Sequence, residues 1–73
     1  MIQLYNMLRK EAEADKAKAL LSIELLGNKA AGIGDHSTED YYKNATEALT
    51  MLTDADDRLE TLNKYFSNET TLN

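Results

Sequence analysis

The chain has 73 residues, with no cysteine, no proline, one histidine and a net charge of −5. A chain of this length forms one small domain at most, and its own core rarely contributes more than about 3–5 kcal/mol. The absence of cysteine excludes disulfides and thiolate metal sites, and a single histidine excludes a His-rich zinc site within one chain. We therefore expect a protein with no metal and no cofactor that depends on helix packing or self-association.

The charge and hydropathy also exclude two classes of partner. Thirteen acidic residues against eight basic ones leave no basic face to neutralise the phosphates of nucleic acid or of an anionic membrane. No apolar run approaches the roughly 20 residues that span a bilayer, and the N-terminus lacks the basic segment of a signal peptide. We expect a cytoplasmic protein that binds neither nucleic acid nor membrane.

The first predicted element is a helix over about residues 2–26. Its seam repeats every four and three residues, the heptad spacing of a helix that twists around a partner. The seam positions are Met1, Tyr5, Leu8, Ala12, Asp15, Ala19, Ser22 and Leu26. Asp15 is the misfit, and two interpretations remain open: it lies at the rim, or it is a buried polar residue that sets the register.

The segment 27–37 is the predicted turn, and it contains all three glycines. Gly27 is expected to end the first helix in the left-handed conformation, and Ser37 or Asp35 is expected to cap the second. The turn is longer than the usual 2–8 residues of a helix–helix connection. It is therefore either a capping structure alone or also a ligand site.

A ligand site here would use glycine N–H groups before a helix N-terminus, which favour anions. Two side chains would supply positive charge and two tyrosine rings would stack on a base. The candidate residues are Lys29, Gly32, Gly34, His36, Ser37, Tyr41 and Tyr42. This chemistry fits a small phosphorylated or nucleotide molecule.

The second predicted helix covers about residues 38–67, followed by a tail over 68–73 that is expected to fray. Its seam is an unbroken heptad pattern: Tyr41, Ala45, Ala48, Leu52, Ala55, Leu59, Leu62 and Phe66. When the chain folds back at the glycines, each residue of this seam faces one of the first seam, and the two residue numbers sum to 67. The prediction is an all-α fold, an antiparallel two-helix hairpin in a single domain.

Further apolar residues lie outside both seams. Those expected to form an interface between copies are Met7, Ala14, Leu21, Leu25 and Leu49. A two-helix hairpin covers only one face of each helix, and a contiguous exposed apolar patch marks an interface. We therefore expect a homo-oligomeric helical bundle, either a dimer or a higher assembly.

Two patterns suggest catalysis or metal binding, but other interpretations fit them better. Asp35, His36 and Ser37 are consecutive, so they cannot form a hydrolytic triad within one chain. The acidic residues around Asp54 and Glu60 lack the glycine and the alternating ligands of a calcium loop. We interpret them as a solvated face, with Asp54 pairing with Arg58 one turn on, and we expect that the protein is not an enzyme.

The segment from Leu26 to Ser37, with the acidic-Leu-Glu pattern of residues 54–62, resembles small uncharacterised proteins of tailed bacteriophages. The resemblance covers about half of the chain, and its one specific motif is the Gly-Ile-Gly-Asp-His turn, Gly32 to His36. The resemblance implies that the protein acts inside an infected bacterium, and it implies no mechanism.

Two functional hypotheses follow. The first is a non-enzymatic, oligomeric phage-type binding protein that sequesters a phosphorylated or nucleotide signal of host defence at the turn. The second is an inhibitor or assembly factor that acts on a host protein through its helical faces.

Overall fold

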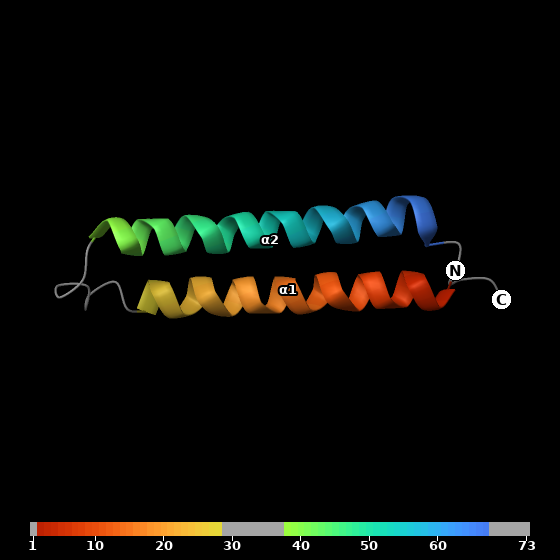
Figure 1. Cartoon of the computed structure of the whole chain (residues 1–73), viewed down its shortest axis with the longest axis horizontal. Helices are drawn as coiled ribbons and strands as arrows, with labels where there is room; N and C mark the ends of the chain where they lie inside the picture. Colours follow the sequence, from red (N-terminus) through yellow and green to blue (C-terminus); the bar gives the residue numbers. More distant parts are fainter. Residues whose placement is uncertain (1, 29–37, 68–73) are drawn as a thin grey trace.

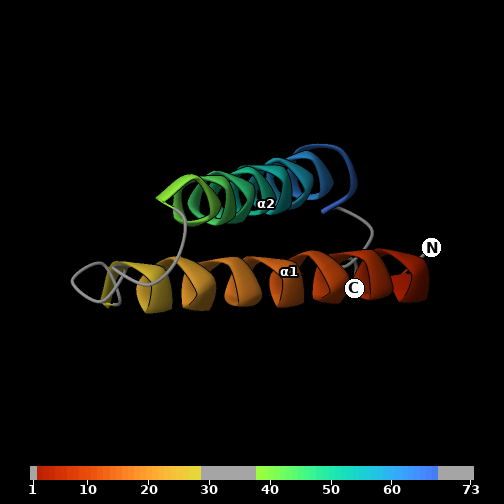
Figure 2. The same cartoon turned by 60° about the vertical axis from the view of Figure 1, so that its left-hand side comes forward.

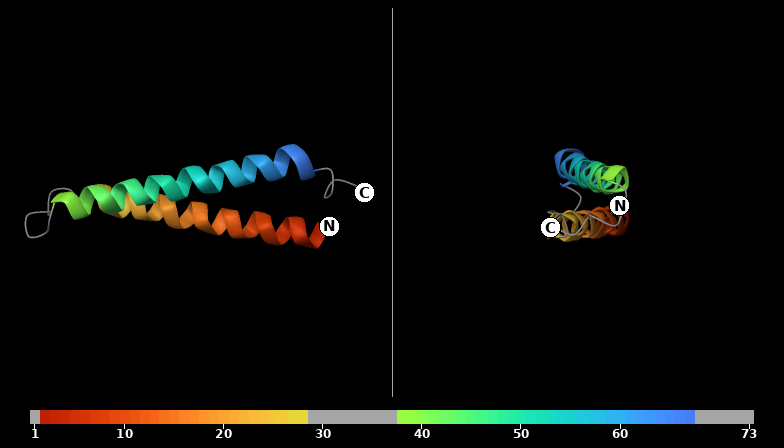
Figure 3. Two further views of the ribbon diagram at one scale, coloured as in Figure 1. Left: turned by 45° about the horizontal axis from the view of Figure 1, so that its top comes forward. Right: turned by 90° about the vertical axis from the view of Figure 1, so that its left-hand side faces the viewer.

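The protein is described by a computed structural model over residues 2–28 and 38–67. It has two helices, α1 (Ile2–Asn28) and α2 (Thr38–Phe66). They run side by side in opposite directions, so the start of α1 and the end of α2 lie at the same end of the molecule (Figure 1). The turned views in Figures 2 and 3 show the same pairing. The predicted all-helical hairpin is thus confirmed for the described residues.

Local sequence favours both helices. Neither contains proline, and the only helical glycine is Gly27, in the last turn of α1. Glu39 and Asp40 lie in the first turn of α2 and Lys64 in its last turn, where their charges complement the helix dipole. The first turn of α1 has no acidic residue and its last turn no basic one. Packing against α2 therefore contributes more to the stability of α1 than dipole complementarity does.

The core is a narrow seam between the helices. Its buried residues are Tyr5, Ala12, Ala19, Ala48, Ala55 and Leu62. These six form three of the pairs predicted to face each other. In a fourth predicted pair, the hydroxyl of Tyr41 donates a hydrogen bond to the carbonyl oxygen of Leu26 at 3.1 Å. These positions agree with the predicted register.

Small side chains dominate this seam. Ala12, Ala19 and Ala55 are fully buried, and no large side chain of the described helices is. Alanine layers let helix backbones approach closely, but each buries little apolar area. The hairpin therefore has a well-defined register and only a small hydrophobic core.

The end of α1 differs from the prediction. The helix continues through Gly27 to Asn28, and the φ of Gly27 is not positive, so the expectation of a left-handed Gly27 is wrong. Glycine costs a helix only about 1 kcal/mol relative to alanine, which is too little to end it. At its other end, α2 stops at Phe66 rather than at residue 67. The proposed cap residues, Asp35 and Ser37, lie outside the described residues.

Candidate functional site

Cross-helix ion pairs mark the two flanks of the seam. On one flank, Lys16 Nζ lies 3.1 Å from Asp56 Oδ1. On the other, Arg58 Nη2 lies 2.8 Å from Asp15 Oδ2, and Arg58 Nε lies 3.0 Å from Asp54 Oδ2. We call these the Asp56 flank (Lys16 and Asp56) and the Arg58 flank (Asp15 and Arg58).

Asp15 therefore lies at the rim of the seam, half-buried and hydrogen-bonded to Arg58. This hydrogen bond is the main cause that raises the pKa of Arg58 above its ordinary value, and the charge of Asp54 adds to it. The predicted pair between Asp54 and Arg58 is also present. All of these groups are partly exposed, so solvent screens their attraction.

The Arg58 flank is hollowed along its length. A hollow of about 400 Å³ lies toward the turn end, beside Leu25 and Met51. A second, of about 290 Å³, lies beside Glu11 and Arg58. A third, of about 120 Å³, lies at the open end beside Leu4. The flank thus offers a shallow groove that side chains of another molecule could fill.

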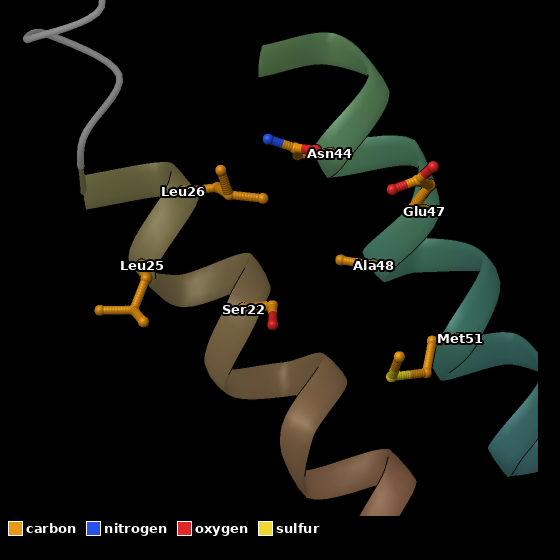
Figure 4. Close-up of a pocket in the computed structure, with 7 residues that line it drawn as sticks. All are labelled: Ser22, Leu25, Leu26, Asn44, Glu47, Ala48 and Met51. Atoms are coloured by element: carbon orange, nitrogen blue, oxygen red, sulfur yellow. The ribbon is translucent and has the colours of Figure 1, made fainter. Parts of the chain in front are cut away.

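Figure 4 shows the hollow of about 400 Å³. Ser22 and Leu26 point toward α2, whereas Ala48 and Met51 point toward α1. Leu25 points away from α2, toward the outer side of α1. The apolar surface therefore continues from the hollow around the outer side of α1.

Large apolar side chains are exposed on both flanks. Those on the Asp56 flank or beside it are Ile2, Leu20, Tyr42 and Leu49. Those on the Arg58 flank or on the adjoining outer side of α1 are Leu4, Met7, Leu8, Leu21, Leu25, Met51, Tyr65 and Phe66. The Arg58 side is therefore the more extensive apolar surface of the described hairpin.

A second heptad pattern follows this side of α1. We call it the outer stripe, and its residues are Leu4, Met7, Glu11, Ala14, Lys18, Leu21 and Leu25. All seven are exposed, and Met7 and Leu21 are 52% and 55% accessible. The predicted interface residues of α1 all belong to this stripe.

The fifth predicted interface residue lies elsewhere. Leu49 is 54% exposed, but it precedes Asp56 by two helical turns and therefore lies on the Asp56 flank. One flat surface cannot include both Leu49 and the outer stripe. The sequence pattern identified both helices' apolar residues but not which of them share a flank.

Most of the predicted ligand site lies outside the described residues. The residues concerned are Lys29, Gly32, Gly34, His36 and Ser37. Tyr41 is half-buried and its hydroxyl is bonded to Leu26. The ring of Tyr42 meets that of Tyr41 edge-on, with centroids 6.0 Å apart, and Tyr42 is 62% exposed. Of the two tyrosines, Tyr42 is the one with a ring free to stack on a ligand.

The acidic face of α2 behaves as a solvated surface. Asp54 and Asp56 each pair with a basic side chain. Within the two described helices, no three carboxylate or imidazole groups gather closely enough to hold a metal ion. Neither helix carries an apolar stretch that could cross a membrane.

Comparison with protein families, curated proteins and solved structures gives no match to this chain. A function for this chain is therefore inferred from its own residues and their arrangement.

Proposed function

We propose that this chain is a non-enzymatic binding protein that associates with its own copies and acts on another protein through its outer helix faces. The observation that supports this best is the contrast between seam and surface. The seam buries mainly alanines, whereas Met7, Leu21 and Leu25 remain about half exposed. Burying a large apolar side chain contributes about 1.5–3 kcal/mol, so association would stabilise the hairpin substantially.

The proposed setting is the cytoplasm of a bacterium infected by a phage, which follows from the resemblance of residues 26–37. A small acidic protein in that setting would block a host protein or support an assembly. Its target would need an apolar surface that complements one flank of the hairpin.

Affinity capture from a bacterial lysate, with the molecular mass followed in parallel, tests this proposal. We expect a defined host protein to bind the wild type and Leu49→Asp, on the exposed Asp56 flank, to abolish the binding. Leu21→Asp or Leu25→Asp should instead lower the molecular mass. Ala17→Asp, at an exposed position facing away from the seam, is the matched control and should leave capture unchanged, as should His36→Ala. Capture that survives all of these changes, or a chain that neither self-associates nor binds a protein, would overturn the proposal.

A second candidate function is the binding of a phosphorylated or nucleotide ligand at the turn end. The exposed ring of Tyr42, supported by Tyr41, favours it. Calorimetric titration against cyclic nucleotides should detect binding that Tyr42→Ala weakens and that Tyr65→Ala, which changes an equally exposed ring, leaves intact. If no nucleotide binds more tightly than about millimolar, roughly −4 kcal/mol, this candidate is wrong.

A further inference from the structure

We infer that two copies of the chain pair through the outer stripe of α1 in antiparallel orientation. The two-fold axis passes beside Ala14, and the turns lie at opposite ends of a four-helix bundle. The inference rests on the proposed self-association and specifies its symmetry and its contacts.

The outer stripe has the same chemistry when read from either end. Its matching positions are Leu4 with Leu25, Met7 with Leu21, Glu11 with Lys18, and Ala14 with itself. The residue numbers of each match sum to 28 or 29, and successive residues rise only about 1.5 Å along a helix. A single two-fold axis therefore places apolar residues against apolar ones and an acid against a base.

The charges favour this orientation. Glu11 and Lys18 are exposed, and neither belongs to the ion pairs found within the described chain. In the antiparallel pair, Glu11 of each copy lies level with Lys18 of the other. Complementary charge fixes the register of a helical interface, and like charges disfavour the wrong one.

Another symmetric arrangement places both turns at the same end. In this arrangement α1 lies against α2 of the second copy. The seam register then determines which residues of the two helices lie at the same height along the bundle. Leu21 and Leu25 would then meet Glu47 and Asn44, and Lys18 would meet Met51. This arrangement buries polar groups against leucines without a partner, which costs free energy.

The size and direction of the surface also fit a second copy. The outer stripe lies roughly 130° around α1 from the buried residues Tyr5, Ala12 and Ala19, on a side of α1 that α2 leaves uncovered. The stripe side of α1, about 40 Å long and about 10 Å wide, presents a face of about 400 Å². Contacts between the two α2 helices of the bundle would bring this toward the roughly 800 Å² that each partner contributes to a standard stable interface.

Cysteine cross-linking tests the position of the axis, because the chain contains no cysteine of its own. Ala14 is small and exposed, so Ala14→Cys places one thiol per copy beside the axis, where two Cα atoms about 4.4–6.8 Å apart form a disulfide. Ala17→Cys is the matched control. We expect mild oxidation to convert most of the Ala14→Cys protein into a covalent dimer and little of the Ala17→Cys protein.

A charge exchange tests the orientation. Glu11→Lys should weaken the dimer about tenfold, equivalent to about 1.4 kcal/mol, because it faces Lys18 of the second copy. Adding Lys18→Glu to the same chain should restore the affinity to within about threefold. Sedimentation measures both affinities, and circular dichroism reports whether the variants remain helical.

The outcomes separate this inference from the proposed function. A chain that stays monomeric at all concentrations overturns both the antiparallel dimer and the proposed self-association. A wild type that associates, while Ala14→Cys cross-links no better than Ala17→Cys, overturns the antiparallel dimer alone. The antiparallel dimer is also overturned if the double variant Glu11→Lys, Lys18→Glu dimerises as weakly as Glu11→Lys alone.

Discussion

At the scale of single residues, Tyr41 and Tyr42 are neighbours with different environments. The hydroxyl of Tyr41 bonds to the backbone of α1, whereas Tyr42 is mostly exposed. Tyr41→Phe should therefore lower the free energy of unfolding by about 0.5–1.5 kcal/mol, the net value of one intramolecular hydrogen bond. Tyr42→Phe is the control in urea denaturation, and an equal loss in both variants would contradict this role of Tyr41.

Arg58 is the residue that joins most charges on its flank. It pairs with Asp15 across the hairpin and with Asp54 along α2, whereas Lys16 pairs with Asp56 alone among the described residues. Arg58→Ala should lower the thermal midpoint more than Lys16→Ala does. The difference should shrink in high salt because ions screen exposed pairs. Equal thermal midpoints of the two variants at low salt would show that the pair between Asp15 and Arg58 adds nothing to the stability.

At the scale of the helix, the continuation of α1 through Gly27 has a measurable consequence. Gly27 has ordinary helical geometry, and an added Cβ would meet no atom within 4 Å. Gly27→Ala should therefore raise the free energy of unfolding by about 0.5–1 kcal/mol. Destabilisation in urea would instead indicate a left-handed Gly27, as the sequence pattern suggested.

The seam was predictable because its signal repeats. Heptad spacing over many turns gave the partner face of each helix, and the buried pairs such as Ala12 and Ala55 agree with it. The end of α1 was not predictable from Gly27, because a single glycine changes helix stability by only about 1 kcal/mol. The cross-helix ion pairs were also missed, because they depend on how far long side chains reach beyond the seam.

At the scale of the whole molecule, more large apolar side chains of the described helices are exposed than are buried in the seam. Sequence periodicity identified the apolar stripes, but only the ion pairs of the structure show which stripes share a flank. That placement separates Leu49 from Leu21 and leaves the outer stripe of α1 as a continuous, self-complementary surface. The proposed ligand site was less predictable, because most of its residues lie outside the two described helices.

Self-association is the central claim, and sedimentation equilibrium tests it most directly. We predict that the wild type sediments at twice the 8.2 kDa mass of one chain. Leu21→Asp should shift it toward the mass of a single chain, since a buried unpaired carboxylate is costly, and Ala17→Asp should not. A wild type that keeps the single-chain mass at every concentration while remaining helical would contradict the account.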